Sequence, residues 1–454
     1  MTDLLSIGAG GVRAYQNALT TTSENIANSG VVGYSRRRTE LTEIAAPGAT
    51  GYSPTKFTRG MGVAVAGISR AADAYKAAAA RSAGADLART EASVEWLAQI
   101  EDALTGAALP ARVTGFFNSA RQLAADPSSV AARSIVLEQA IMVAGSFRAT
   151  GAALDKVQVQ VDETARDLTD KLDGFGRALA VINEKMGRIE PNSSAAAAMA
   201  DERDRLLEAM SQVADINVAI DGIGRATVRL GASNGPLFVS GTQVGDLAYS
   251  RGTAGAAQFA VYLAGEAEFV QPSGGALGAV ADAANRTFDA RSRIKELAFE
   301  FGEAVNDNQA QGFGLGAAAG PDMFETAPDL ESFNLSDFDV TAIEPDGIAA
   351  ASAPDRPRDA SNLALLQEAR VAGGFEARLA DMTVANATAL NQRRLVADAQ
   401  TAIRDGAVAA RDAVSGVDLD QEAVDLIRFQ QAYQASSRVI QVARDTFQSI
   451  LEIR

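Results

Sequence analysis

The residues with the most obvious potential for chemistry form an acidic cluster near the carboxyl end of the sequence. Its members are Asp418, Asp420, Glu422 and Asp425. Closely spaced carboxylates can bind a cation, but an EF-hand calcium loop also needs a glycine at its sixth position and a distal glutamate, and both are missing. Carboxylates at a helix start also cap the helix and interact favourably with its dipole. We interpret the cluster as a helix cap, with a cation site as the alternative.

A second candidate is the glycine-rich stretch 312–320, which superficially resembles a phosphate-binding loop. It lacks the dinucleotide pattern and the Lys-Ser/Thr pair, and Pro321-Asp322 stands where a helix should start, so we predict a flexible loop. The chain has no cysteine and no histidine, which excludes disulfides, thiolate metal sites and the Ser-His-Asp triad. We therefore predict no enzyme, no cofactor and no metal, although carboxylate, lysine or tyrosine chemistry remains open.

The charge distribution points away from nucleic acid and membrane partners. The net charge is −16, whereas binding to phosphates needs a basic surface. The basic run Arg36-Arg37-Arg38 is short, and we expect it to meet acidic neighbours in an assembly. We expect the mixed run 201–205 to be a solvated helix face with pairs of opposite charge. No apolar run of ~18 residues exists and no signal peptide is recognisable, which predicts no membrane partner.

Long helices are predicted at both ends, because no proline occurs in 1–46 or in 358–454. The first should cover 2–28 and the last 419–451, with Asp418 as the N-cap of the last. Apolar residues at heptad spacing mark a narrow seam on each helix: Leu5, Val12, Leu19 and Ile26 on the first, and Leu426, Phe429, Tyr433, Ile440, Phe447 and Ile450 on the last. We predict that the two seams pair as a parallel or antiparallel coiled coil and form the assembly interface. Gly8 and Gly11 are weak helix formers, so the first helix should need that partner.

Between its ends the chain alternates between two kinds of pattern. Helical periodicity dominates, but alternating apolar residues and turn signals at 215–272 indicate a small antiparallel β module. The predicted fold class is mainly α with an inserted small β domain. The predicted division is 1–69 with 418–454 as a terminal core, 70–214 with 280–310 and 361–417 as a helical bundle, 215–279 as the β domain, and 311–360 as a loop-rich excursion.

Several motifs resemble those of one protein family. Asn25 and Asn28, followed by Gly33 and Tyr34, fit a signature in which the first helix ends and a strand begins. Near the carboxyl end, Ser-Gly-Val at 415–417 and Phe-Gln-Gln-Ala-Tyr-Gln-Ala at 429–435 fit a characteristic closing helix. With further matches inside the chain at 201–207 and 301–313, the sequence resembles the bacterial flagellar rod, hook and hook-associated proteins over most of its length.

The resemblance implies a structural subunit at the junction between hook and filament, built into a ring of its own copies on the hook end. It implies the hook protein and the second hook-associated protein as partners, together with an export chaperone at the C-terminal helix. The location would be the extracellular flagellum, reached from the cytoplasm by type III export. Longer family members insert an outer β domain that is reduced here to about 320–360. A different axial subunit, a carboxylate cation-binding protein and an adhesin are the alternatives.

Overall fold

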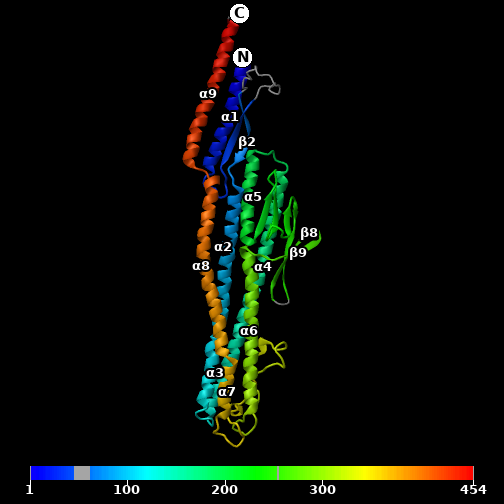
Figure 1. Ribbon diagram of the computed structural model, residues 1–454, viewed down its shortest axis with the longest axis vertical. Coiled ribbons are helices and arrows are strands. Elements are labelled where there is room, and N and C mark those ends of the chain that lie inside the picture. Colours follow the sequence, from blue (N-terminus) through cyan, green and yellow to red (C-terminus); the bar gives the residue numbers. More distant parts are fainter. Residues whose placement is uncertain (1, 45–61, 253–254, 453–454) are drawn as a thin grey trace.

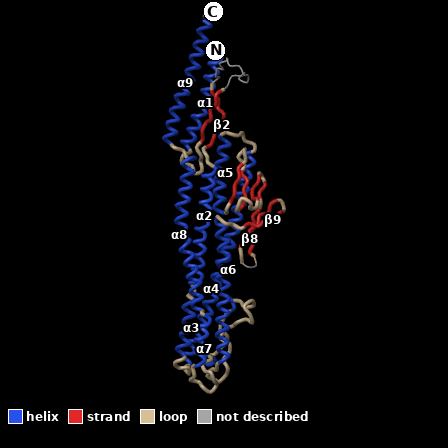
Figure 2. The backbone as a smooth tube through the Cα atoms, viewed as in Figure 1, coloured by secondary structure: helices blue, strands red, loops and turns tan. Residues whose placement is uncertain are grey.

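The computed structural model describes residues 2–44, 62–252 and 255–452 of the chain and is strongly elongated (Figure 1). Helix α1 (Thr2–Ala27) and helix α9 (Leu419–Glu452) lie together at one end, where both termini are found. A body of long helices extends from them to the other end. One pair of strands lies beside α1, and the remaining strands lie along one side of the body (Figure 2). The predicted fold class, mainly helical with an inserted small β region, is confirmed.

Seven α-helices in the described part of the chain build the body: α2 (Ala74–Thr105), α3 (Leu109–Leu123), α4 (Val130–Met186), α5 (Ser194–Val213), α6 (Gly275–Gln311), α7 (Ser361–Gly373) and α8 (Phe375–Ser415). Side chains that accept backbone hydrogen bonds begin three of them, namely Asp73, Ser129 and Ser193. Sequence periodicity missed α7. Gly374, with φ of +57°, separates it from α8 at a sharp turn that favours glycine.

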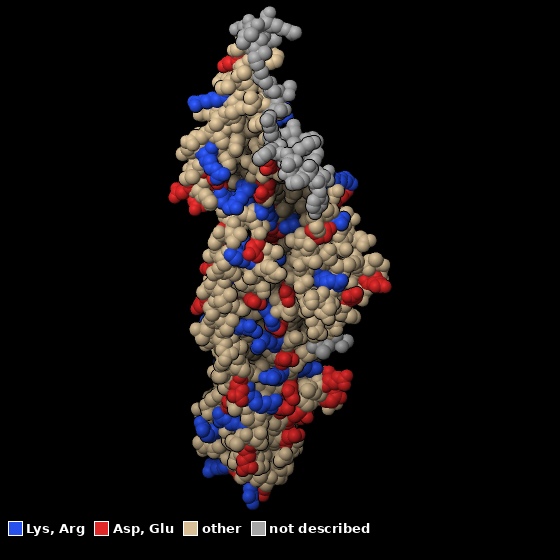
Figure 3. Space-filling model, turned by 45° about the horizontal axis from the view of Figure 1, so that its top comes forward, with Lys and Arg blue, Asp and Glu red and all other residues tan. Residues whose placement is uncertain are grey.

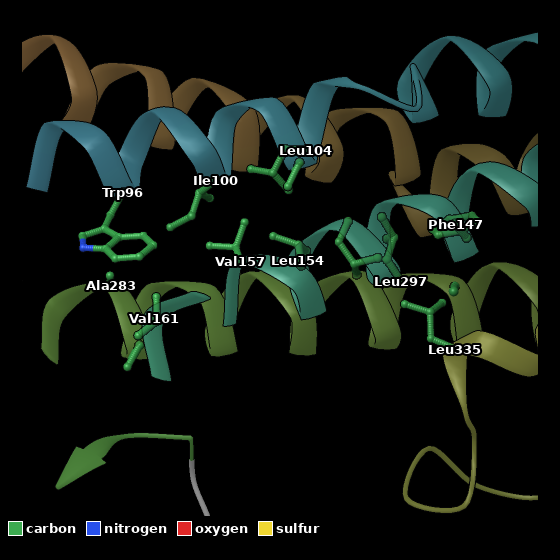
Figure 4. Close-up of a cluster of buried hydrophobic side chains, with 14 of the residues drawn as sticks. Trp96, Ile100, Leu104, Phe147, Leu154, Val157, Val161, Ala283, Leu297 and Leu335 are labelled. Atoms are coloured by element: carbon green, nitrogen blue, oxygen red, sulfur yellow. The ribbon is translucent and has the colours of Figure 1, made fainter. Parts of the chain in front are cut away.

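The body has a continuous apolar core (Figure 4). On α2, Trp96 lies over Ala283 of α6, and Ile100 lies beside Val157 and Leu154 of α4. Helix α4 is long and apolar enough in one stretch to cross a bilayer by length and composition alone. Large apolar side chains such as Phe147 and Leu154 are nevertheless buried against the neighbouring helices, while Ile135 and Ile141 on the other face of α4 are exposed, so α4 is an amphipathic helix of this core.

The segment between α6 and α7, predicted as a loop-rich excursion, consists of loops that pack back onto the body. It contains two short 3-10 helices, η1 (Leu335–Asp337) and η2 (Pro345–Gly347). Phe324 and Phe338 stack with ring centroids 5.2 Å apart and are fully buried. The segment therefore completes the core at the far end of the body.

The described strands form three antiparallel sheets: β1 (Arg37–Glu43) with β2 (Val63–Arg70); β3 (Ile216–Ile220), β4 (Ala226–Leu230), β5 (Leu237–Ser240) and β6 (Gln243–Val244); and β7 (Asp246–Arg251), β8 (Ala257–Leu263) and β9 (Glu266–Val270). The first sheet lies against α1 and leads into the body. The other two cover one side of α4, where Leu247 N–H donates to the buried Asp173 carboxylate over 3.0 Å. Much of the loop predicted between β1 and β2 lies outside the described residues.

Candidate assembly interface and its anchor to the helical body

Helices α1 and α9 run antiparallel and approach each other through small residues. A Cβ atom added at Gly8 would lie 2.7 Å from Cγ1 of Ile440, and one at Gly11 would lie 2.6 Å from Oγ of Ser436. Further along, the rings of Tyr15 and Phe429 are 6.4 Å apart. The antiparallel alternative is therefore the correct one. A side chain at either glycine would therefore require Ile440 or Ser436 to shift, and a large one would push the helices apart.

The apolar residues predicted for the two seams flank this contact. Seven of them are half-buried, namely Val12, Leu19, Ile26, Leu426, Phe429, Tyr433 and Ile440, while Leu5 and Phe447 are exposed. The side chain of Ile450 lies outside the described residues. The fully buried positions of α1 are small or polar: Gly8, Gly11, Ala14, Ala18, Thr21, Thr22 and Asn25. The heptad pattern identified which helices pair, whereas small side chains set the closest approach.

A second apolar stripe runs along the outside of α9. It consists of the exposed side chains Val424, Ile427, Val439 and Val442. Val424 and Val442 are about five turns apart and point the same way, roughly 140° around the helix from Phe429. Figure 3 shows few charged side chains at the upper end of the molecule, where these helices lie, whereas both charge signs are interspersed over the body. Helix α9 thus presents one face to α1, and its opposite face carries this stripe, which the exposed Gln431 and Arg438 interrupt.

A buried polar cluster holds the start of α9 in place. The side chain of Glu422 is only 1% exposed, and its two oxygens accept hydrogen bonds from Arg36 Nε over 2.5 Å and from Asn25 Nδ2 over 3.0 Å. Asn25 Oδ1 in turn accepts from the Tyr34 hydroxyl over 2.9 Å and from Arg37 N–H over 3.0 Å. The motif residues Asn25 and Tyr34 therefore meet in one cluster, which joins the end of α1, the start of β1 and the start of α9.

The cluster continues into the helical body through α5. Arg37 and Arg70 both contact the Asp201 carboxylate, at 3.4 Å and 3.2 Å, and Arg70 and Arg203 both contact Asp204. The prediction that 201–205 form a solvated helix face is wrong, because Asp201 and Arg203 are buried. Only the outermost pair, Glu202 with Arg205, has the expected i,i+3 geometry on the surface.

The same contacts correct the interpretation of the basic run. We expected Arg36-Arg37-Arg38 to meet acidic residues of an assembly partner, but Arg36 and Arg37 meet carboxylates of their own chain. Pairing an arginine with a buried carboxylate avoids an uncompensated charge, and removing one partner typically costs about 3–5 kcal/mol. The run therefore anchors the terminal helices to the body.

Burial and neighbouring arginines shift the pKa values of the α5 carboxylates in opposite directions. Burial raises the pKa of Asp201, and its contacts with Arg70 and Arg37 offset this only partly. Burial also acts to raise the pKa of Asp204, but Arg70 and Arg203 together outweigh it and lower that pKa. Burial likewise raises the pKa of the Tyr34 hydroxyl, so this group remains a hydrogen-bond donor at neutral pH.

Asn28 and Gly33 shape the turn between α1 and β1. The Asn28 side chain donates to the Glu24 carbonyl over 2.9 Å just after α1 ends. Gly33 has φ of +79°, and a Cβ there would lie 2.6 Å from Cγ of Arg205. Gly33 thus adopts a left-handed backbone conformation and also lets the turn approach α5 closely, which few other residues could do.

Three carboxylates of the acidic cluster, Asp418, Glu422 and Asp425, already bind other groups of the protein. Asp418 Oδ1 accepts from the N–H groups of Asp420 and Gln421, as an N-cap does. Glu422 and Asp425 both contact Arg36. Over the described ranges, no group of three or more acidic side chains is arranged to hold a metal ion.

Sequence reasoning missed the anchoring residues on the body, chiefly Arg70, Asp201 and Asp204. Their partners lie far away in sequence: Arg37 and Asp201, for example, are 164 positions apart. A charged residue on a helix gives no local sign that it is buried. The only available signal was the run of five charged residues in succession beside the apolar Leu206-Leu207 pair.

Two family models match this chain. One is described as the flagellar hook-associated protein FlgK helical domain and matches residues 97–324, half of the chain. The other is described as the flagellar basal body rod FlgEFG protein C-terminal and matches residues 411–453, which include all of α9.

Individual proteins agree with the family models. The flagellar hook-associated protein 1 of Escherichia coli is 26% identical over 71% of this chain, and that of Bacillus subtilis is 24% identical over 96% of it. The matches span 60% and 62% of the length of the Escherichia coli and Salmonella typhimurium relatives, but 95% of the Bacillus one. A solved structure of the flagellar hook junction protein FlgK from Burkholderia pseudomallei has the same fold, with a TM-score of 0.63 at 13% identity, covering 74% of this chain and all of that one.

Proposed function

The chain belongs to the flagellar hook-associated protein FlgK family, and from this premise we propose that it is a structural subunit joining the hook of a bacterial flagellum to the filament. The role is assembly, with no catalytic step. The observation that carries the proposal is the antiparallel terminal pair, which is anchored to the body through Arg36 and Glu422 while the apolar side chains of the outer stripe of α9 stay uncovered.

The proposed assembly proceeds through the uncovered face of that pair. Within one chain, α1 covers only one side of α9. The stripe from Val424 to Val442 stays exposed, and contact with other copies would remove its apolar surface from water. Burying apolar surface stabilises an interface by about 25 cal/mol per Å². The seam residues such as Phe429 would keep α1 and α9 together, and the outer stripe would bind neighbouring subunits.

The partners and the location follow from the family. We propose a ring of copies of this chain between the hook protein and the second hook-associated protein, in the extracellular flagellum. The subunit would leave the cytoplasm by type III export after an export chaperone has bound its C-terminal helix. In this proposal 1–69 and 418–454 form the assembly core, and the remaining helices with the β module at 215–279 surround it.

A deletion strain tests the role directly. We expect electron microscopy to show hooks without filaments, and an assay of the culture medium to find released flagellin, because the filament would have nothing to attach to. Missing hooks would instead identify the chain as a hook or rod subunit. Intact motile filaments would refute a structural role in the flagellum altogether.

A further inference from the structure

A cavity of about 420 Å³ lies where the terminal helices meet the body. Its wall is formed by the turn at 29–35, the start of α2, one side of α5, and the end of α8 with the linker to α9. This volume lies within the range of small-molecule and side-chain pockets. Glu422 does not line the cavity, although Tyr34, Arg70 and Asp204 of the anchoring network do.

Every acidic side chain that lines the cavity already has a partner. Asp204 contacts Arg70 and Arg203, while Glu208 and Asp412 both contact Arg411, at 3.0 Å and 2.9 Å. The remaining one, Asp73, accepts two backbone hydrogen bonds as the N-cap of α2. No carboxylate of the lining is therefore left over for a further cation.

Arg81 is the basic residue of the lining that lacks a partner. Among the described residues, its guanidinium makes no hydrogen bond or ion pair, although it carries five N–H donors. Burial lowers its pKa, and the attraction of Asp204 and Glu208 is opposed by Arg203 and Arg411. A half-buried guanidinium of this kind gains two parallel charge-assisted hydrogen bonds when a carboxylate enters.

We propose that this cavity binds a carboxylate through Arg81, and that the carboxylate is an acidic side chain of a neighbouring copy of this chain. The identification of a neighbouring copy as the source of the carboxylate rests on the proposed ring. Two observations favour a second copy over a free small acid. The rim carries the exposed side chains Val31 and Val32, the latter 87% exposed, which an apolar residue beside the incoming acid would cover. The chain also has 57 acidic against 41 basic residues, so its copies offer many acidic side chains.

The site itself is tested on the full-length monomer with sodium succinate as the probe. Methyl groups of Val31, Val32 and Ala77 are followed by NMR at constant ionic strength. We expect saturable shifts in the wild type, their loss in Arg81→Met and their retention in Arg81→Lys, which keeps the charge. Arg121→Met, on the exposed side of α3, is the matched control and should behave as the wild type. Equal shifts in Arg81→Met, or no saturable shifts in the wild type, would overturn the site.

The source of the carboxylate is tested in assembled flagella. A photoreactive p-benzoylphenylalanine in place of Val32 should produce an adduct of two copies of this chain on irradiation. An adduct with another protein alone, or no adduct, would overturn the neighbouring copy as the source. Filaments still attached in that strain would show that the junction role survives such a result, whereas motile filaments in the deletion strain would overturn the role itself.

Discussion

Replacing Arg36 by methionine is the most direct test of how the terminal helices are anchored. The Arg36 side chain is 7% exposed and is the only cation within 4 Å of the Glu422 carboxylate among the described residues. Methionine preserves much of the apolar stem but removes the guanidinium. Glu422 would keep one donor, Asn25 Nδ2, but would lose its cationic partner in a site that is closed to solvent.

The free-energy cost of the Arg36→Met substitution follows from the burial of Glu422. Leaving one member of a buried ion pair without its partner costs about 3–5 kcal/mol, whereas a solvent-exposed pair contributes about 0–1 kcal/mol. Each 1.4 kcal/mol is a factor of ten in an equilibrium constant. We therefore expect local opening of the α1–α9 pair to become roughly a hundredfold to a few thousandfold more frequent.

Hydrogen–deuterium exchange of the backbone amides in α1 and α9 measures that opening. Protection in the core of α4 should not change, because no contact there involves Arg36. Arg428→Met is the matched control, since that arginine is 74% exposed and 3.7 Å from Asp425. The double variant Arg36→Met/Glu422→Gln should recover most of the protection, because neither charge remains. Unchanged exchange of α9 in Arg36→Met would refute the anchoring role.

Four further outcomes are expected. Gly8→Leu should separate α1 from α9 and speed exchange in both, whereas Gly84→Ala in α2, where a Cβ meets nothing within 4 Å, should stabilise the chain by up to about 1 kcal/mol; equal effects would contradict the close-approach argument. Val424→Asp should leave the helical circular dichroism of the monomer unchanged but abolish filament attachment, and normal attachment would argue against the outer stripe. Phe429→Asp, on the other face of α9, should instead speed exchange of α1 in the monomer itself, which Val424→Asp should not do. Asp173→Asn should raise the thermal unfolding midpoint at pH 7 but not at pH 3. Burial raises the pKa of Asp173, so the wild type loses stability as the pH rises from the ordinary pKa of 3.8 through the raised pKa. A gain in the midpoint at pH 3 would contradict this.

The sequence by itself determined the order and type of most elements. Proline-free ends predicted 2–28 and 419–451 as helices, and the structure has Thr2–Ala27 and Leu419–Glu452. Local rules succeed here because proline, capping residues and apolar periodicity act within a few residues. Asp418 was correctly identified as a cap for this reason. Helix α7 was missed because Gly373-Gly374 divides a stretch that reads as a loop followed by one helix.

The tertiary structure alone decided which side chains form the interface. Heptad apolar residues marked α1 and α9 as partners, but the closest contact falls on Gly8 and Gly11, because backbone approach is limited by the smallest residues present. The anchor was also hidden: Arg36 and Glu422 are 386 residues apart, and nothing local distinguishes a buried ion pair from a solvated charge. Burial depends on what the rest of the chain packs against each residue, and that packing is a property of the whole fold.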